Sequence, residues 1–459
     1  MAGRRDPLTA ITERWGAAAY IVMLLGTEVL TMLVRTLGSS LDGGQVILRL
    51  AAYATGMVLA VFLWRQAPSR LPARGLLRVF LVLALALWVL EAGRRWMAGA
   101  WLNPIWLAVP LLVVLLWRKP PNRAEATAAV TGVAVAFMGV VLAALVLERA
   151  GMTRDLYVNM ESLREFDLVN YWLPLSDLLG VDGRWAGPFP HPNHAGPVGA
   201  LLIVVGLCRT GIVQASLIPM GFVVLLVTSS RTSTVAGLAG ASAVLLSALL
   251  WDRRRSLIQW TILSGVPFLL AAVALRSVQG GVAASGSGEE VARRVESAMG
   301  RSTIWPTYLQ IWLESPWTGS PDRRIVLAAQ RGDLPDWAAT AHNLLLDALV
   351  RFGLIGSVVV VAALTVAGVM TVRAAAAGVR VGVGLLAVIV ACGLTEALVS
   401  WLQWSASTII LFLAVIASIG PYPPARWRPS PSSEPETMNE VAASSSGARN
   451  RSGPGPETT

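Results

Sequence analysis

The sequence predicts an all-α, polytopic membrane protein with about twelve transmembrane helices. Three observations favour this class: the composition, a series of long apolar segments, and the spacing of arginines between those segments. Of the 459 residues, 55% are hydrophobic and only 14% are charged, whereas a typical soluble domain has about 25% charged residues. A chain of this length with so few charges cannot cover its surface with polar side chains, so we expect lipid to cover it.

The apolar segments define the expected helices, because each approaches the roughly 20 residues that a helix needs to cross a bilayer. The expected spans are 17–36, 45–64, 75–92, 102–117, 127–148, 195–209, 211–228, 233–251, 256–275, 354–372, 380–397 and 401–419. Together they form one membrane domain, residues 1–419. The tail that follows, residues 420–459, is rich in Pro, Ser, Gly and Glu and is expected to be a disordered cytoplasmic segment.

The positions of the arginines predict the orientation of the chain. The net charge is +10, and Lys119 is the only lysine. Arginines cluster in alternate loops, for example after the spans 45–64 and 233–251, as expected of cytoplasmic loops, so their number does not indicate a nucleic-acid partner. Both termini are therefore expected in the cytoplasm. Two long loops, 149–194 and 276–340, are expected on the outer side of the cytoplasmic membrane.

Polar residues gather in three islands on this outer side. The first is GPFPHPNHAGP (187–197), the second is TSSRTST (228–234), and the third is the second long loop with the segment TAHNLLLDALVRFGLIG (340–356) that follows it. All three histidines of the chain lie in the first and third islands. This concentration indicates a chemical site at one membrane surface.

Two arginines in the islands are candidates for binding an anion. Arg231 lies between two apolar spans among Ser and Thr residues, and a cation at membrane depth usually has a partner; the alternative is an arginine that extends to the lipid headgroups. Arg301 lies between an amphipathic helix expected to end at Gly300 and a helix expected to start near Ser302. Free N–H groups at a helix start favour anions, and a solvated loop arginine is the alternative.

His342 is the candidate general base. It follows Thr340, the expected N-cap, so we expect it on a short helix at the outer membrane edge, interrupted at Gly353 and Gly356. Histidine is the side chain best suited to take a proton near neutral pH, although a lone histidine is more often structural. No acidic residue lies one turn away on the same face, so any partner that orients the ring must come from elsewhere in the fold.

The other two histidines, His191 and His194, have a spacing that would suit a metal ion. No thiol or third histidine accompanies them, so no metal site is expected. Pro192 lies between them and disfavours a regular helix there. Asn193 and the neighbouring prolines are instead expected to shape the entrance of the next span.

Two acidic residues, Glu28 and Glu396, lie in apolar spans. Charged groups at such positions usually pair with another polar group. We expect a structural role for both, such as a pair with Arg35 or Arg49, rather than contact with a substrate.

In this order, the polar segments resemble the O-antigen ligase and O-antigen polymerase superfamily of membrane glycosyltransferases. The matching elements are FPHPN at 189–193, the pair Ser230–Arg231, the stretch from Gly300-Arg301 to Trp305, and AHNLLLDALVRFGLIG from Ala341. The resemblance is close over roughly residues 185–360. One such element alone is a weak signal, but four in order on one membrane side are fairly specific.

The resemblance implies a GT-C-like fold with a long, helical external loop. It also implies transfer of a glycan from a polyprenyl-pyrophosphate carrier to an acceptor sugar hydroxyl at the outer leaflet, with inversion and without a metal or other cofactor. By position, Arg231 and Arg301 match the arginines that bind the donor pyrophosphate, and His342 matches the proposed catalytic base. The residues expected to line the same cavity are His191, Asn193, His194, Ser230 and Asn343.

Several alternatives remain open at this point. Wall-polymer or capsule polymerases and protein-targeting oligosaccharyltransferases look similar to this superfamily. A ligase and a polymerase share donor and mechanism and differ in the acceptor, which is a lipid-core sugar or another lipid-linked chain. A transporter or flippase of lipid-linked oligosaccharides belongs to a different class and would need polar residues spread through the membrane midplane. Here the polar residues concentrate at one surface, which favours an enzyme. No pattern in the sequence specifies the sugar, the carrier length or the oligomeric state.

The topology predicts which introduced cysteines a membrane-impermeant thiol reagent will reach. A thiol at Ser285 should be modified from outside intact cells, and a thiol at Ser256 should not, because the arginine pattern places these residues on opposite sides. Lysed cells, in which both positions should react, provide the control. The reverse labelling pattern would contradict the outer location of the polar islands.

Overall fold

A computed structural model describes residues 15–37, 44–68, 71–97, 104–150, 185–189, 192–228, 230–251, 300–335, 340–394, 396 and 405–419. In these ranges every element of regular secondary structure is a helix, which confirms the all-α prediction. The predicted span 256–275, the predicted disordered tail, most of the loop 149–194 and the first part of the loop 276–340 lie outside the described residues.

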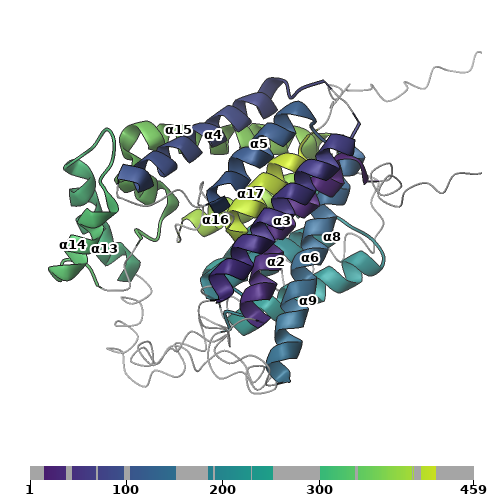
Figure 1. Cartoon of the computed structure of the whole chain (residues 1–459), viewed down its shortest axis with the longest axis horizontal. Coiled ribbons are helices and arrows are strands. Elements are labelled where there is room, and N and C mark those ends of the chain that lie inside the picture. The colour runs from purple at the N-terminus through teal and green to yellow at the C-terminus, as the bar shows by residue number, and fades with distance from the viewer. Residues whose placement is uncertain are drawn as a thin grey trace, which may run out of the picture. The chain divides into compact units, whose positions relative to one another are not determined.

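The helices follow the apolar segments of the sequence (Figure 1). The first part of the chain contains α2 (Ala17–Leu37), α3 (Gly44–Gln66), α4 (Gly75–Met97), the 3-10 turn η1 (Pro104–Leu107), α5 (Ala108–Arg118) and α6 (Arg123–Arg149). The second part contains α8 (Pro192–Leu207), α9 (Ile212–Thr228), α10 (Arg231–Trp251), α13 (Gly300–Leu313), α14 (Asp322–Gln330), α15 (Leu344–Ala376), α16 (Val381–Gly393) and α17 (Ala406–Ala417). Apart from 256–275, each predicted span corresponds to one of these helices.

Four of the described helices are long and apolar enough to cross a membrane: α4, α6, α10 and α15. The other apolar helices have shorter apolar parts of 10–17 residues each, such as Ala17–Thr31 in α2 and Leu50–Gln66 in α3. Along α15, Val358, Val361, Val369 and Val372 are exposed, and their spacing places them in a stripe that lipid would cover. The apolar helices thus indicate a multi-pass membrane protein. The number of twelve spans and the GT-C-like fold remain predictions.

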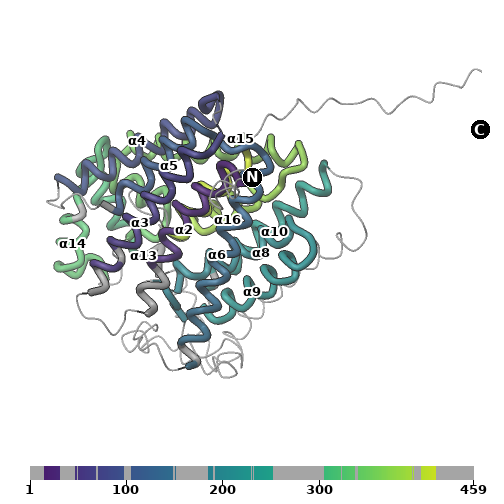
Figure 2. Tube along the Cα trace, turned by 45° about the vertical axis from the view of Figure 1, so that its right-hand side comes forward, coloured from purple at the N-terminus to yellow at the C-terminus, as the bar shows by residue number. Residues whose placement is uncertain are grey.

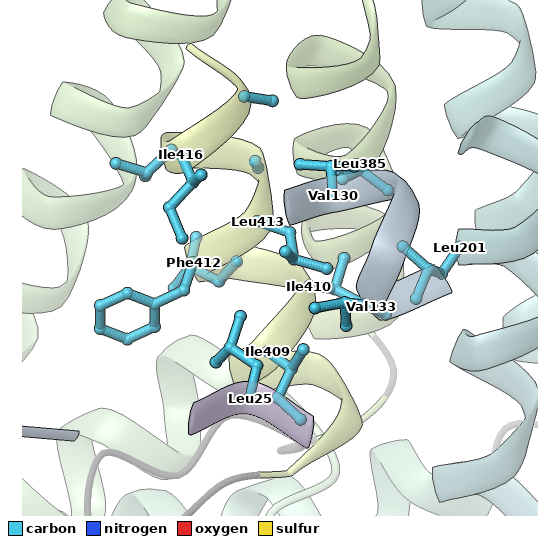
Figure 3. Packing of buried hydrophobic residues seen from close by; sticks show 14 of the residues in the cluster. Leu25, Val130, Val133, Leu201, Leu385, Ile409, Ile410, Phe412, Leu413 and Ile416 are labelled. Atoms are coloured by element: carbon cyan, nitrogen blue, oxygen red, sulfur yellow. The ribbon is translucent and has the colours of Figure 1, made fainter. Parts of the chain in front are cut away.

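Helix α17 lies at the centre of the hydrophobic core (Figure 3). All of its residues are buried, and it packs against α6, α8, α15 and α16. The ring of Phe412 meets that of Phe80 on α4 edge to face, with 5.7 Å between centroids. A helix that is apolar on every side must be enclosed, and twelve residues extend only about 18 Å, so protein rather than lipid surrounds α17.

The described residues between α16 and α17, Leu394, Glu396 and Ser405, are not helical. Helix α16 ends at Gly393, so it is shorter than the predicted span 380–397. Glu396 therefore lies beyond the helix, contrary to the expectation that it belongs to an apolar span, and it is only 3% exposed. Non-helical backbone at membrane depth is tolerated where protein encloses it, which apolar composition alone does not reveal.

Helix α15 is broken near its start, at Gly353, whose φ and ψ are 64° and −167°. The turn after α13 packs into this break: Ser320 N donates to Val350 O at 2.7 Å, and Leu354 N donates to Pro316 O at 2.8 Å. Of the two predicted interruptions, Gly353 is therefore confirmed, whereas Gly356 stays helical. The break attaches the segment after α13 to the first turns of α15, and α13 and α14 lie next to this end of α15 (Figure 1). Figure 2 shows the same helices from a second side.

We predict that Gly353→Ala lowers the free energy of unfolding by about 3 kcal/mol or more. Dihedral strain alone accounts for about 1–3 kcal/mol, and a Cβ atom at this position would lie 2.3 Å from the carbonyl group of Trp317. Thermal unfolding of the detergent-solubilised protein measures the loss. Gly139→Ala on α6 is the matched control, because a Cβ there meets no atom within 4 Å; it should be neutral or slightly stabilising. Equal melting temperatures for the two variants would contradict the described break.

Candidate functional site

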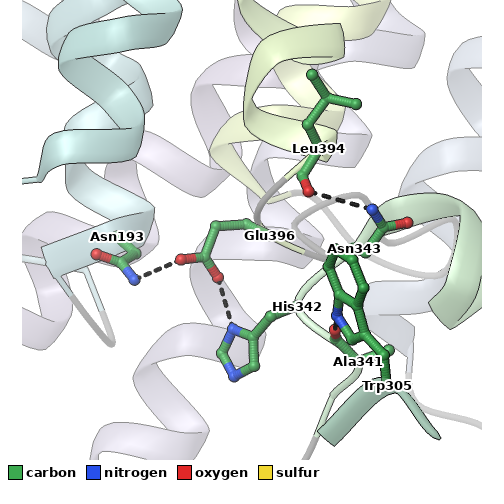
Figure 4. Close-up of polar contacts among 7 residues, drawn as sticks. All are labelled: Asn193, Trp305, Ala341, His342, Asn343, Leu394 and Glu396. Atoms are coloured by element: carbon green, nitrogen blue, oxygen red, sulfur yellow. Dashed lines mark hydrogen bonds and ion pairs between the residues drawn. The ribbon is translucent and has the colours of Figure 1, made fainter. Parts of the chain in front are cut away.

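A single buried carboxylate connects two of the polar islands (Figure 4). Glu396 Oε2 lies 2.9 Å from His342 Nδ1, and Asn193 Nδ2 donates a hydrogen bond to Glu396 Oε1 at 2.8 Å. The Glu396 side chain is 4% exposed and that of His342 is 19% exposed. The carboxylate of Glu396, in the segment after α16, therefore joins the start of α8 to the segment that precedes α15.

His342 has an unusual backbone conformation. Its φ of 48° makes it the one residue other than glycine with a positive φ in the described part of the chain. Such a left-handed residue costs about 1–3 kcal/mol, and this strain is frequent at functional sites. His342 therefore lies just before α15, contrary to the prediction from the sequence that it would lie on a short helix.

Asn343, rather than the predicted Thr340, caps α15. Its Oδ1 accepts hydrogen bonds from Leu345 N at 3.1 Å and Leu346 N at 3.0 Å, and asparagine is among the strongest N-cap residues. The amide nitrogen of the same side chain contacts the end of α16, where Asn343 Nδ2 donates to Leu394 O at 3.1 Å. The two sides of the site are therefore bonded together at two adjacent residues, His342 and Asn343.

Helix α8 begins at Pro192, contrary to the expectation that this proline disfavours a helix. Proline is well accommodated at the first helical position, because the N–H that it lacks has no partner there. Asn193 and His194 consequently lie in the first turn of α8. His194 is also close enough to Glu396 for the two to interact electrostatically. His191 lies outside the described residues.

The start of α10 lies against this same part of α8. Ser230 is buried, and its Oγ lies 2.8 Å from Ser233 Oγ. A Cβ atom added at Gly196 on α8 would lie 2.3 Å from Ser233 Oγ and 2.9 Å from Ser230 Cβ, so glycine is needed at this crossing. The backbone of Arg231, the first residue of α10, therefore lies beside the turn of α8 that carries Asn193. The side chain of Arg231 is outside the described atoms.

The third island reaches the site through α13. This helix begins at Gly300, two residues before the predicted start, so Arg301 lies in its first turn rather than in a joint. One turn further on, Trp305 Nε1 donates to Ala341 O at 3.1 Å. Residues four apart share a helix face, so the backbone of Arg301 lies on the side of α13 that meets the segment before His342. The Arg301 side chain is not among the described atoms.

The role of Glu396 was missed by reasoning from the sequence, which assigned it a structural pair with an arginine. The usable signal was an acid in an apolar segment, which often marks a functional site; its partner was 54 residues away along the chain. Glu28, the other acid of this kind, accepts a hydrogen bond from the Tyr53 hydroxyl on α3. The side chains of its predicted partners, Arg35 and Arg49, lie outside the described atoms.

The contacts assign different tasks to the two ring nitrogens of His342. A carboxylate can only accept hydrogen bonds, so neutral His342 donates from Nδ1 to Glu396, and its Nε2 carries the lone pair. An imidazole held in this way is suited to take a proton from a hydroxyl group at Nε2. The neighbouring carboxylate also stabilises the imidazolium ion that forms.

Residues 215–361 of the chain match the O-antigen ligase family. The matched range includes Ser230, Arg231, Arg301 and His342, and it supports the superfamily whose pattern the polar segments resemble. Asn193 and Glu396 lie outside the matched range and enter the site only through the fold. A search of curated proteins finds no match to this chain.

Proposed function

From the match to the O-antigen ligase family, we propose that this chain is an inverting membrane glycosyltransferase of cell-surface polysaccharide assembly. It transfers a glycan from a polyprenyl-pyrophosphate carrier to an acceptor sugar hydroxyl at the outer face of the cytoplasmic membrane. The observation that carries the proposal is the contact between His342 Nδ1 and Glu396 Oε2. This contact supplies an oriented base beside the starts of α8 and α15.

In the proposed reaction, the acceptor hydroxyl oxygen attacks the anomeric carbon of the donor sugar. The bond from that carbon to the pyrophosphate oxygen breaks, and the carrier pyrophosphate leaves with the electron pair. His342 Nε2 takes the hydroxyl proton, and Glu396 stabilises the resulting imidazolium ion. Attack from the face opposite the leaving group inverts the anomeric configuration.

The leaving group requires positive charge, which we assign to Arg231 and Arg301. Arg231 is the first residue of α10, and Arg301 is the second residue of α13. At both positions, the free N–H groups of the helix start add to the attraction for an anion. Two guanidinium groups can each donate two hydrogen bonds to phosphate oxygens as negative charge develops. The proposed chemistry therefore needs no metal ion.

We predict that His342→Ala lowers turnover by about 10²–10⁴-fold, the usual contribution of a positioned base. Binding of the lipid-linked donor should be retained, because donor binding is assigned to the arginines. Purified enzyme assayed for glycan transfer and for release of the carrier pyrophosphate tests this, and the second readout distinguishes an enzyme from a flippase. Unchanged turnover in the variant would remove His342 from the mechanism.

Glu396→Gln tests Glu396 as a positioning residue. If the glutamine carbonyl keeps the hydrogen bond from Asn193, its amide nitrogen faces His342 Nδ1 and donates to it. The imidazole proton then moves to Nε2, so the base is blocked. We expect kcat to fall by about 10²-fold or more with little change in KM for the donor. Asn193→Ala is the control, since it leaves the contact between the carboxylate and His342 in place and should reduce kcat much less.

We predict that Arg231→Lys and Arg301→Lys each lower kcat/KM by at least about tenfold. Lysine keeps the charge but loses the planar pair of donors that matches a phosphate group. Donor titrations of the purified variants, with the acceptor held constant, give the ratio. Lysine variants that both transfer glycan at the unmodified rate would rule out bidentate binding of the pyrophosphate by these residues.

A further inference from the structure

A cavity of about 740 Å³ lies at the end of α15 opposite to His342. Arg373, in the last turn of α15, contributes to its wall, together with Arg74 at the start of α4 and Ile419 after α17. His342 and Arg373 are separated by 31 residues, or about 45 Å along a helix. This cavity is therefore distinct from the site built around Glu396.

The cavity combines an apolar interior with a basic rim. Leu77, Met370 and Ile419 are buried, whereas the side chains of Arg74 and Arg373 are exposed. Among the described residues that form its wall there is no aspartate or glutamate. The two guanidinium groups are thus the charged groups that an occupant would meet.

Neighbouring contacts hold the basic rim in place. Ala73 N donates to Trp117 O at 2.7 Å, and the guanidinium of Arg78 lies 4.7 Å from the centre of the Trp117 ring. Lys119 is engaged elsewhere, since its Nζ donates to Trp64 O at 2.8 Å and Ala67 O at 2.5 Å at the end of α3. The rim of the cavity is therefore attached to the ends of α4 and α5.

We propose that this cavity binds an anionic phospholipid, with the phosphate group between Arg74 and Arg373 and the acyl chains over the apolar wall. Arginine pairs with phosphate through two parallel hydrogen bonds, and basic pockets between membrane helices on the cytoplasmic side bind anionic headgroups. The volume is within the range of about 300–1,000 Å³ found for small-molecule sites. The arginine pattern places this end of α15 in the inner leaflet.

A lipid fits the surroundings better than a soluble anion does. Leu71 at the cavity, in the segment before α4, and Val372 on α15, next to Arg373, are 69% and 47% exposed. Such exposed apolar side chains at the end of a membrane helix are suited to contact with acyl chains. A soluble phosphate would satisfy the arginines but leave this apolar wall uncovered. The segment that follows Ile419 has acidic residues at Glu434, Glu436 and Glu440 and is the competing occupant that the test must separate.

Lipid titration of the full chain tests the proposal. Native mass spectrometry of the detergent-solubilised protein should show retention of phosphatidylglycerol in preference to phosphatidylcholine. In the double variant Arg74→Gln and Arg373→Gln, the affinity for phosphatidylglycerol should fall by about tenfold or more, whereas phosphatidylcholine retention should not change. Arg118→Gln is the matched control, because Arg118 is exposed at the same end of the helices but is not part of the wall. Equal phosphatidylglycerol affinity in the double variant and the control would overturn the proposal.

Two further measurements separate the sources of the anion without relying on the double variant. Glycerol phosphate at millimolar concentration should not displace phosphatidylglycerol; complete displacement would indicate a soluble-anion site instead. A benzophenone amino acid at Leu71, in full-length protein reconstituted into mixed vesicles of the two lipids, should form a cross-link to phosphatidylglycerol. A cross-link to residues 420–459 or to a second copy of the chain would assign the cavity to that segment and overturn the proposal.

Discussion

The buried carboxyl group of Glu396 is the constraint on which the candidate site depends. A carboxyl group with only 3% exposure is tolerated when hydrogen bonds satisfy its oxygens. Here Asn193 satisfies one oxygen and His342 the other. These two contacts link three segments that are far apart in the sequence, and the bond from Asn343 to Leu394 O reinforces the same junction. Removal of the carboxylate would leave both partners without their acceptor.

The site lies between two groups of helices, each with its own hydrophobic core, and the carboxylate joins them. Helices α13 and α14 share a small core of their own with the start of α15, which includes Ile304, Tyr308, Ile325 and Val350. The larger core belongs to the bundle around α17. Because α15 contributes to both cores and breaks at Gly353, it connects α13 and α14 to the bundle around α17. Arg301 and His342 therefore belong to the group of α13 and α14, whereas Asn193, Arg231 and Glu396 belong to the bundle.

This division has a consequence for the proposed chemistry. In the proposed reaction the base, His342, lies on the group of α13 and α14, and the carboxylate that orients it, Glu396, lies on the bundle. The base is therefore correctly oriented only when the two groups of helices are in contact. The two arginines assigned to the pyrophosphate also lie on different groups, Arg301 on α13 and Arg231 on α10. A donor that spans the junction would favour contact between the two groups of helices, so donor binding and the orientation of His342 would be coupled.

The amino-acid sequence by itself determined the helical class, the positions of the apolar helices in the described ranges and the presence of polar segments, because apolar periodicity and segment length are local properties of the chain. It also indicated His342, Asn193 and Asn343 as residues of one site. Only the tertiary structure decided that Glu396 is the partner of His342, that Asn343 caps α15, and that α16 ends before Glu396. The physical reason is that a buried carboxylate obtains its partners through the packing of α8, α15 and α16, and no local pattern in the sequence records which segments will meet.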